Sequence, residues 1–339
     1  MSSPSLPLLV IPYEIVVREI DGAVLLAHLY SRYGGKTLIG QKSSLFPLIP
    51  CLKGSIWFLK SIVPGEIYLS KKLKDNNCRI LSYDVEGLVP SEGSVGILQR
   101  FSEESLSYVD QHFCWSFDEY QRYISVFPHL KDKFSVSGIP IQESWDHYCF
   151  DKSNISKRNI LLVSSFPFAC SQSLDYNIEQ SKSCSNSFAE KESHLLKEIS
   201  MQKDGYFLTK QLLDYLIDHD FHVTIRKHPA EIENLWKSYL ASPNVSFDSG
   251  IQPIAKSICE NSNVICFNST VSVQASSMLR PCFQLLPDYY LRQYSSVLSS
   301  VALRHTYQFT KPNDVLNAIS SNLPPKLKTS FPSSSTKFL

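Results

Sequence analysis

Short apolar runs alternate along the chain with segments in which apolar residues recur every three or four positions. The first pattern is typical of a buried strand, and the second of a helix with one face on a core. Over the first 140 residues the alternation predicts strands at 7–17, 36–41 and 79–89; residues 55–62 form either a strand or a short buried segment, and residues 133–140 close this half. Helices are predicted at 19–34, 66–78 and 102–113, the last starting with a capping-box pattern from Ser102 to Ser105, and a strand-to-helix unit is predicted at 114–128.

The same alternation resumes after a polar stretch and continues to residue 320. Strands are predicted at 159–169, 221–228, 244–250, 263–269 and 281–286, and helices at 206–220, 229–241, 253–262, 270–279 and 311–320. Between them, the Ser-, Lys- and Glu-rich segment 171–204 is interpreted as a long excursion outside the core, helical only at 189–201.

Strands alternating with helices predict parallel sheets covered by helices. We therefore expect an α/β protein of two Rossmann-like, doubly wound domains that face a cleft. The expected boundaries are 1–150 and 151–323, followed by a mobile tail at 324–339.

Composition limits the classes of partner that the protein is expected to bind. The 339 residues carry a formal net charge of +1, which argues against nucleic-acid binding. The N-terminus lacks the basic region and long apolar core of a signal peptide, and no run reaches the roughly 20 apolar residues of a membrane-spanning helix. A cytoplasmic protein, at most peripherally associated with the inner membrane, is expected. The nine cysteines include no CxxC pair, so no zinc site is expected.

A basic cluster ends the strand predicted at 221–228. Arg226, Lys227 and His228 lie where the strand gives way to a helix predicted to begin at Pro229. A helix N-terminus binds anions, and an imidazole can donate a hydrogen bond to a phosphate. Strand alternation directs only one of the two cations inward. The alternative is a histidine that merely ends a strand.

A second strand-to-helix junction follows in the same half. The strand at 263–269 delivers Asn268, Ser269 and Thr270 to the start of a helix. These side chains either cap that helix or surround an anion together with the backbone N–H groups. Two such junctions at strand carboxyl ends predict one phosphate site held from two sides.

Paired acids end a strand of the first half. Asp84 and Glu86 precede Gly87, which allows a sharp turn, and strand alternation directs the two carboxylates the same way. One acid can serve as a base on an acceptor hydroxyl, or attack an anomeric carbon as a nucleophile. The alternative is a solvated loop with two ordinary acids. Arg18 and Glu19, at the start of the first helix, either face the acceptor or belong to the helix N-terminus.

These elements resemble a known family. The basic-His-Pro element, the Asn-Ser-Thr helix start and the "SSMLRPC" segment are similar to glycosyltransferases of GT-B architecture, above all those that use CMP-activated acidic sugars. Those are the keto-deoxy-octulosonate capsule transferases and the sialyltransferases; the CDP-glycerol glycerophosphotransferases carry a similar pair. The first half resembles bacterial surface carbohydrate biosynthesis proteins, and the likeness runs from about Pro12 to Pro281.

The resemblance implies residue roles. His228, Ser269 and Thr270 would hold the nucleotide phosphate, and Glu86 would be the nucleophile or base with Asp84 as its partner. Gln274 stands where many such enzymes have a glutamate that binds ribose. Ile139 and Ile141 stand where relatives tend to have Asn and Arg.

The sequence thus predicts a metal-independent glycosyltransferase without a cofactor. It would move a sugar from a nucleotide donor, CMP-linked by resemblance, to a surface polysaccharide or lipid-linked glycan acceptor. A glycerophosphate or polyol-phosphate transferase, a UDP-sugar epimerase and a catalytically silent partner in glycan assembly remain alternatives.

Overall fold

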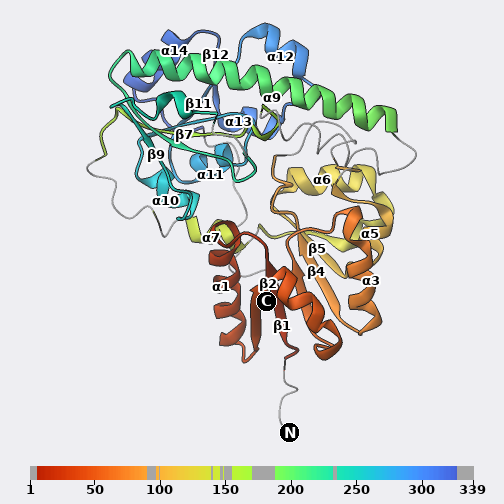
Figure 1. Cartoon of the computed structure of the whole chain (residues 1–339). Coiled ribbons are helices and arrows are strands. Elements are labelled where there is room, and N and C mark those ends of the chain that lie inside the picture. The colour runs from red at the N-terminus through yellow and green to blue at the C-terminus, as the bar shows by residue number, and fades with distance from the viewer. Residues whose placement is uncertain are drawn as a thin grey trace. The chain divides into compact units, whose positions relative to one another are not determined.

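The structure is a computed structural model that describes residues 6–89, 97–98, 100–138, 140–145, 148, 155–169, 188–231 and 235–326. It divides into two compact units. Unit 1 is built from the chain up to His147, and unit 2 from Tyr148 to Lys328. Each unit is an α/β domain around one parallel sheet (Figure 1). The expected α/β class is therefore confirmed. Of the expected excursion at 171–204, residues 171–187 lie outside the described part of the chain.

The sheet of unit 1 has six strands in the order β2-β1-β3-β4-β5-β6, and every pairing is parallel. This is one of the two common doubly wound orders, in which the sheet grows in both directions from β1. The strands are β1 Leu9–Tyr13, β2 Thr37–Gln41, β3 Ile56–Leu59, β4 Arg79–Tyr83, β5 Gln111–Cys114 and β6 Phe134–Val136.

The helices of unit 1 follow the predicted pattern in part, but the helix predicted at 102–113 ends at Ser107, and residues 111–113 belong to β5. The α-helices are α1 Val16–Arg32, α2 Lys42–Leu45, α3 Ile67–Asp75, α5 Glu103–Ser107, α6 Phe117–Val126 and α7 Pro140–Trp145. Short 3-10 helices cover Phe46–Cys51, Pro64–Glu66 and Pro128–Lys133. Ser102 caps α5 in a reciprocal capping box with Ser105, as its sequence predicts.

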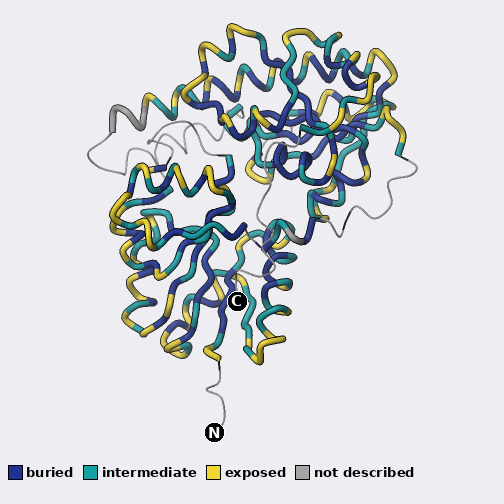
Figure 2. Tube along the Cα trace, turned by 180° about the vertical axis from the view of Figure 1, so that it is seen from behind, coloured by how far each residue is buried: buried dark blue, intermediate teal, exposed yellow. Residues whose placement is uncertain are grey.

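Alternate residues of the central strands supply the two faces of this sheet. Leu9 and Ile11 of β1 pack on one face with Ala23 and Leu26 of α1. Val10, between them, belongs to the core on the other face, with residues of α3, α5 and α6. Because side chains of a strand alternate in direction, a strand that is apolar at every position needs helices on both faces. In both units the buried residues run along the central strands (Figure 2).

The sheet of unit 2 has the order β12-β11-β10-β7-β8-β9, again all parallel. Counted within the unit this is the 6-5-4-1-2-3 order of the Rossmann fold. The strands are β7 Asn159–Val163, β8 His222–Arg226, β9 Val245–Phe247, β10 Asn263–Cys266, β11 Cys282–Leu285 and β12 Tyr307–Phe309. The sequence pattern did not predict β12.

The helices of unit 2 include two that the sequence pattern missed, α12 and α13. The α-helices are α9 Phe188–Ile217, α10 Ile254–Cys259, α11 Val271–Ser277, α12 Asp288–Tyr294, α13 Ser300–His305 and α14 Pro312–Ser320, and 3-10 helices cover Pro167–Ala169 and Lys237–Tyr239. Lys326 donates from Nζ to the Thr306 carbonyl (2.8 Å). Residues 324–326 therefore belong to the folded unit, although we expected a mobile tail from 324; residues 327–339 lie outside the described part of the chain.

Helix α9 joins what we expected to be two separate segments. It runs for 30 residues without a break, as the long green helix of Figure 1 shows. Ile199 and Met201 of this helix are buried, and Met201 belongs to the core of unit 2, so this part of the expected excursion is core. At Gly205 a Cβ atom would come within 2.6 Å of the Phe267 ring, which explains why a glycine stands inside the helix. Among the described residues, no helix is long and apolar enough to cross a membrane.

Candidate functional site

In unit 2, the two predicted junctions follow strands that flank β7. Val163, the last residue of β7, lies in register with both Arg226 of β8 and Cys266 of β10. Adjacent strands are about 4.8 Å apart, so the chains leaving β8 and β10 start about 10 Å from each other. The sheet order also reverses between β7 and β10, the position at which open parallel sheets bind ligands. Both junctions therefore share one edge of the sheet.

Arg226 is occupied within the fold. Its Nη1 donates to Asp248 Oδ2 (2.8 Å) and Ser257 Oγ (3.0 Å), and its Nη2 donates to the Gln252 carbonyl (2.7 Å). Burial raises the pKa of Asp248, but hydrogen bonds from Ser257, Gly250 and Arg226 outweigh it and lower that pKa. Arg226, which is 8% exposed, thus ties β8 to the chain around β9 and α10. The expectation that Arg226 adds charge to an anion site is corrected accordingly.

After His228 the chain turns back on itself. Ala230 N donates to His228 Nδ1 (3.1 Å), and Glu231 N donates to the His228 carbonyl (3.0 Å). Residues 229–230 and 235–236 form turns, and of the described residues in the expected helix only Lys237–Tyr239 is helical, as a 3-10 turn. The expected helix start at Pro229 is therefore wrong, and among the described residues no helix N-terminus stands beside His228.

Glu231 explains this turn. Its Oε1 accepts hydrogen bonds from Ser164 Oγ (2.5 Å) and from Phe166 N (3.0 Å), so the carboxylate lies inward, against the chain leaving β7. Trp236, fully buried, donates from Nε1 to Ser164 Oγ (3.0 Å). Burial raises the pKa of Glu231, although these hydrogen bonds partly oppose it. The inward carboxylate and indole fix the loop that carries Lys227 and His228, both of which are half-buried.

The second junction is shaped by Asn268. This residue has a φ of 42°, a left-handed conformation that Asn tolerates better than most residues. Its Oδ1 accepts from Ser299 N (2.8 Å), which fastens the loop before α13 to the end of β10. Ser269 Oγ accepts from Val271 N (3.3 Å), and Thr270, the residue before α11, makes no side-chain capping bond. Ser269 and Thr270 are half-buried at this end of the sheet, whereas the Asn268 side chain holds the loop before α13.

Gln274, expected near the ribose, lies on α11 and is 8% exposed. The helix is buried along most of its length. Gln274 is therefore part of the helix that the second junction begins, one turn behind Thr270.

In unit 1, the predicted acids occupy unequal positions. Asp84 follows β4, is 1% exposed, and receives a two-pronged hydrogen bond from Arg100. Arg100 Nε donates to Asp84 Oδ2 (2.8 Å), and Arg100 Nη2 donates to Asp84 Oδ1. Glu86, on the turn that follows, keeps 48% of its side chain exposed. Asp84 is thus buried against an arginine, and the expectation that it acts on a substrate is corrected: it positions Arg100.

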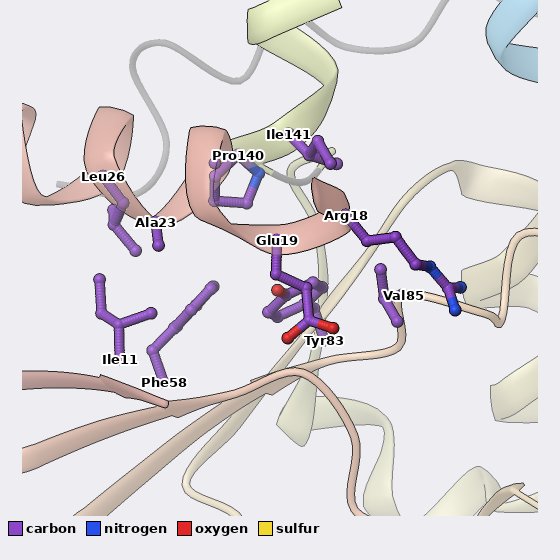
Figure 3. A pocket seen from close by; sticks show the side chains of 11 residues that line it. Ile11, Arg18, Glu19, Ala23, Leu26, Phe58, Tyr83, Val85, Pro140 and Ile141 are labelled. Carbon is purple, nitrogen blue, oxygen red and sulfur yellow. The ribbon is translucent and has the colours of Figure 1, made fainter. Parts of the chain in front are cut away.

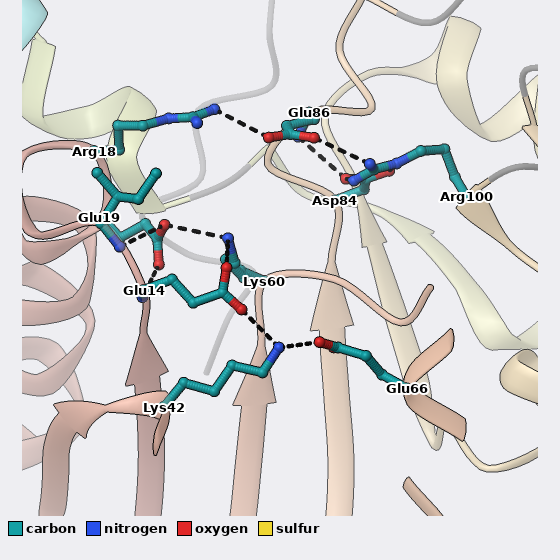
Figure 4. Close-up of polar contacts among 10 residues, drawn as sticks. Glu14, Arg18, Glu19, Lys42, Lys60, Glu66, Asp84, Glu86 and Arg100 are labelled. Atoms are coloured by element: carbon teal, nitrogen blue, oxygen red, sulfur yellow. Dashed lines mark hydrogen bonds and ion pairs between the residues drawn. The ribbon is translucent and has the colours of Figure 1, made fainter. Parts of the chain in front are cut away.

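Glu86 bridges two arginines (Figure 4). Arg18 Nη2 lies 3.4 Å from Glu86 Oε1, and Arg100 Nη1 lies 3.0 Å from Glu86 Oε2. Burial lowers the pKa of Arg100, but the charges of Asp84 and Glu86 outweigh it and raise that pKa above its usual range. Arg18, one of the two residues expected on the acceptor side, therefore forms an ion pair with Glu86.

Glu19 forms hydrogen bonds with backbone N–H groups just before α1. It is 5% exposed, and its carboxylate accepts from Glu14 N (2.9 Å) and Ile15 N (3.3 Å), just before α1. These bonds satisfy N–H groups that a helix start leaves free. Lys60 Nζ lies 3.4 Å from Glu19 Oε1.

An ion-pair chain that the sequence analysis missed crosses the carboxyl edge of this sheet (Figure 4). Glu14, Lys42 and Lys60 are the first residues after β1, β2 and β3. Glu14 lies 2.6 Å from Lys42 and 2.7 Å from Lys60, and Lys42 also pairs with Glu66. Burial raises the pKa of Glu14, but its bonds to both lysines outweigh it and lower that pKa. Only Lys42 directly follows a segment predicted as a strand, because Glu14 and Lys60 lie inside the segments 7–17 and 55–62, so the sequence pattern gave no signal for the whole chain of ion pairs.

The reversal of strand order in unit 1 lies between β1 and β3, where Glu14 and Lys60 pair. A small pocket opens beside it, between α1 and the sheet (Figure 3). Arg18 and Glu19 are its charged lining residues, and Val85 and Ile141 of α7 also line it. Gly22 of α1 lies so close to α7 that an added Cβ would stand 2.8 Å from Ile141 N. Ile139, the other departure from the family pattern, lies outside the described residues.

A buried carboxyl lies beneath the turn that carries Glu86. Glu119 is 1% exposed and accepts hydrogen bonds from Trp115 N (2.5 Å) and Tyr123 Oη (2.6 Å). Burial raises the pKa of Glu119 to about 7, although these bonds oppose it. Trp115 donates from Nε1 to the Asp84 carbonyl (2.6 Å) and is 3% exposed, so it supports the Asp84 turn from below. Among the described residues, no three His, Cys, Asp or Glu side chains form a group that could hold a metal ion.

No family model matches this sequence, and no curated protein matches it. Solved structures match along nearly the whole chain. The UDP-GlcNAc 2-epimerase from Neisseria meningitidis, bound to UDP-GlcNAc, aligns with a TM-score of 0.56 at 11% identity, over 93% of this chain and 90% of that one. The UDP-N-acetylglucosamine 2-epimerase from Rickettsia bellii gives 0.55 at 11% identity, over 94% and 87%.

The wall teichoic acid polymerase TagF gives a TM-score of 0.53 at 13% identity, over 94% of this chain and 80% of that one. With two six-stranded parallel sheets covered by helices, the chain has the two-domain α/β architecture of these enzymes, GT-B. At these low sequence identities, the similarity shows a shared fold and nothing more.

Proposed function

We propose that this chain is an enzyme of surface-glycan synthesis that transfers a group from a nucleotide-activated donor. One observation carries the proposal: in unit 2, Lys227 and His228 after β8 and Ser269 and Thr270 after β10 share the sheet edge at which the strand order reverses. This is the position at which Rossmann-type sheets hold nucleotide phosphates.

His228 suits a phosphate contact. Its Nδ1 accepts from Ala230 N, so the neutral ring carries its hydrogen on Nε2, the donor that a phosphate oxygen requires. Lys227 adds positive charge, and the hydroxyls of Ser269 and Thr270 supply donors from the other side of β7. A donor phosphate bound there would be stabilised by these groups as it leaves, which requires no metal ion.

Unit 1 would supply the reacting carboxylate. Of the two acids, only Glu86 is accessible, so we assign it the role of nucleophile or base, with Asp84 and Arg100 holding the turn in place. We propose glycosyl transfer from a CMP-linked acidic sugar to a surface polysaccharide or lipid-linked acceptor. The second candidate is transfer of glycerophosphate from a CDP-linked donor, which the fold shared with the TagF polymerase favours.

A thermal-shift comparison of CMP, CDP, UDP and GDP on the full chain tests the nucleotide site. A nucleotide present at 100 times its Kd stabilises the folded protein by about 2.7 kcal/mol, which amounts to several degrees. We expect CMP or CDP to give this shift in the wild type and His228→Ala to lose most of it. His219→Ala is the matched control, because His219 is an exposed histidine before β8, at the opposite end of the same strand.

Stabilisation by no nucleotide, or equal loss in both histidine variants, would refute the nucleotide site. Product analysis with CMP-sugars, CDP-glycerol and UDP-GlcNAc then separates glycosyl transfer from glycerophosphate transfer and from epimerisation. Normal glycan output from the Glu86→Gln and His228→Ala variants would instead identify a catalytically silent partner.

A further inference from the structure

We propose that Arg18 and Arg100 form a binding clamp for an oxyanion of the substrate held by unit 1, and that Glu86 occupies this clamp until the substrate displaces it. The inference rests on the proposed function, which it extends by the chemical class of that substrate: a sugar carboxylate or a phosphate monoester. The clamp is drawn in Figure 4.

The two arginines hold one carboxylate from opposite sides. Arg18, from the first turn of α1, reaches Glu86 Oε1, and Arg100, from a separate segment, reaches Glu86 Oε2. Each oxygen of the carboxylate thus has its own guanidinium. A carboxylate or phosphate from a ligand presents the same pair of oxygens, and guanidinium groups recognise both by such paired contacts.

Arg100 is fixed before any ligand arrives. Its Nε and Nη2 are both bonded to Asp84, which is 1% exposed, so its orientation is set by a buried group. Only Nη1 is directed to Glu86. Replacing the Glu86 carboxylate by that of a ligand leaves this buried pair unchanged, so the clamp needs no rearrangement to accept the ligand.

Glu86 is the group that can leave. Its side chain is 48% exposed, and exposed ion pairs contribute little net stability. Its backbone N–H donates to Asp84 Oδ1 (3.1 Å), so the turn remains held when the side chain rotates away. The two arginines also keep one anion each in contact: Arg100 stays bonded to Asp84, and the ligand anion takes the place of the Glu86 carboxylate between Arg18 and Arg100.

The displaced Glu86 would then be an unpaired carboxylate next to the bound substrate. Binding of the acidic group would therefore release the nucleophile or base that the proposed function requires. A neutral substrate would leave Glu86 paired between the arginines, so the clamp selects for acidic substrates.

Titration of the full chain with glucuronate and with glycerol 3-phosphate tests the clamp, with glucose and glycerol as neutral controls. Because Glu86 competes with the ligand, Glu86→Gln should tighten binding of the anionic probe, by about three- to tenfold for two exposed ion pairs. Arg18→Gln should weaken binding of the same probe by a similar factor. The probe that responds identifies the source of the anion, carboxylate or phosphate.

Glu103→Gln is the matched control. Glu103 is an exposed carboxylate of unit 1, paired with His129 at 2.8 Å, and its loss changes the net charge of the protein as much as the loss of Glu86 does. It should leave binding of both probes unchanged. Equal tightening in Glu86→Gln and Glu103→Gln, or no binding of either probe even to Glu86→Gln, would overturn the clamp.

The outcomes also separate this inference from the proposed function. Binding of CMP or CDP, together with no effect of Glu86→Gln on either probe, rejects the clamp alone. Absence of nucleotide binding rejects the proposed function, whatever the probes show.

Discussion

Asp84 and Glu86, two residues apart, should differ sharply in their contribution to the stability of unit 1. Replacing Asp84 by Asn leaves Arg100 facing a neutral amide in a place where Asp84 is 1% exposed and Arg100 is 25% exposed. Removing one partner of a buried ion pair costs about 3–5 kcal/mol of unfolding free energy. Because Arg100 is partly hydrated, we expect the lower end, about 3 kcal/mol. Glu86→Gln, at a side chain 48% exposed, should cost less than about 1 kcal/mol.

Urea unfolding followed by tryptophan fluorescence measures the difference. Three of the four tryptophans, Trp57, Trp115 and Trp145, belong to unit 1, and all three are buried, so their emission reports on its unfolding. The slope of the free energy against urea should stay the same in both variants, while the midpoint falls mainly in Asp84→Asn. Equal midpoints in the two variants would refute the assignment of Asp84 as the buried anchor.

A double variant sharpens the argument. Asp84→Asn combined with Arg100→Met removes the charge that the single variant leaves without its partner. The double variant should therefore be more stable than Asp84→Asn alone, because an uncompensated buried charge costs more than a missing pair. Strictly additive losses would mean that the two side chains are not coupled.

Two further predictions concern packing and pH. Gly22→Ala should destabilise the protein by about 1–3 kcal/mol, since the new methyl group meets backbone atoms of Ile141, whereas Gly65→Ala, with no atom within 4 Å of its Cβ position, is the control; equal denaturation midpoints would contradict this. Glu119 has a folded-state pKa raised to about 7 by burial, so the folded state binds a proton more tightly than the unfolded state. Its contribution to stability is therefore lost as pH rises from about 4.5 to about 7, by at most about 1.4 kcal/mol per pH unit. Glu119→Gln should flatten this decline in unfolding experiments at several pH values, and an unchanged decline would contradict it.

Much of the architecture could be predicted because apolar periodicity is a local property. The β-strands at 159–169 and 263–269 were recognised from their apolar runs, and Ser102 with Ser105 identified a helix start. Elements α12, α13 and β12 were missed, since segments such as Tyr307–Phe309 are too short to show a period. The helix at 229–241 was predicted from Pro229 and its spacing, but the inward bonds of Glu231 to Ser164 and Phe166 redirect the chain.

The candidate site divides in the same way. The sequence by itself determined that Asp84 and Glu86, and likewise Arg226 and His228, end predicted strands, because position in a strand depends on neighbours in the chain. Only the tertiary structure decided which of each pair is accessible. Asp84 and Arg226 are bound by Arg100 and Asp248, residues 16 and 22 positions away, and burial makes those pairs part of the fold. Contacts between distant segments leave no period in the sequence, so the sheet order and the ion pairs across its edge appear only when the chain is folded.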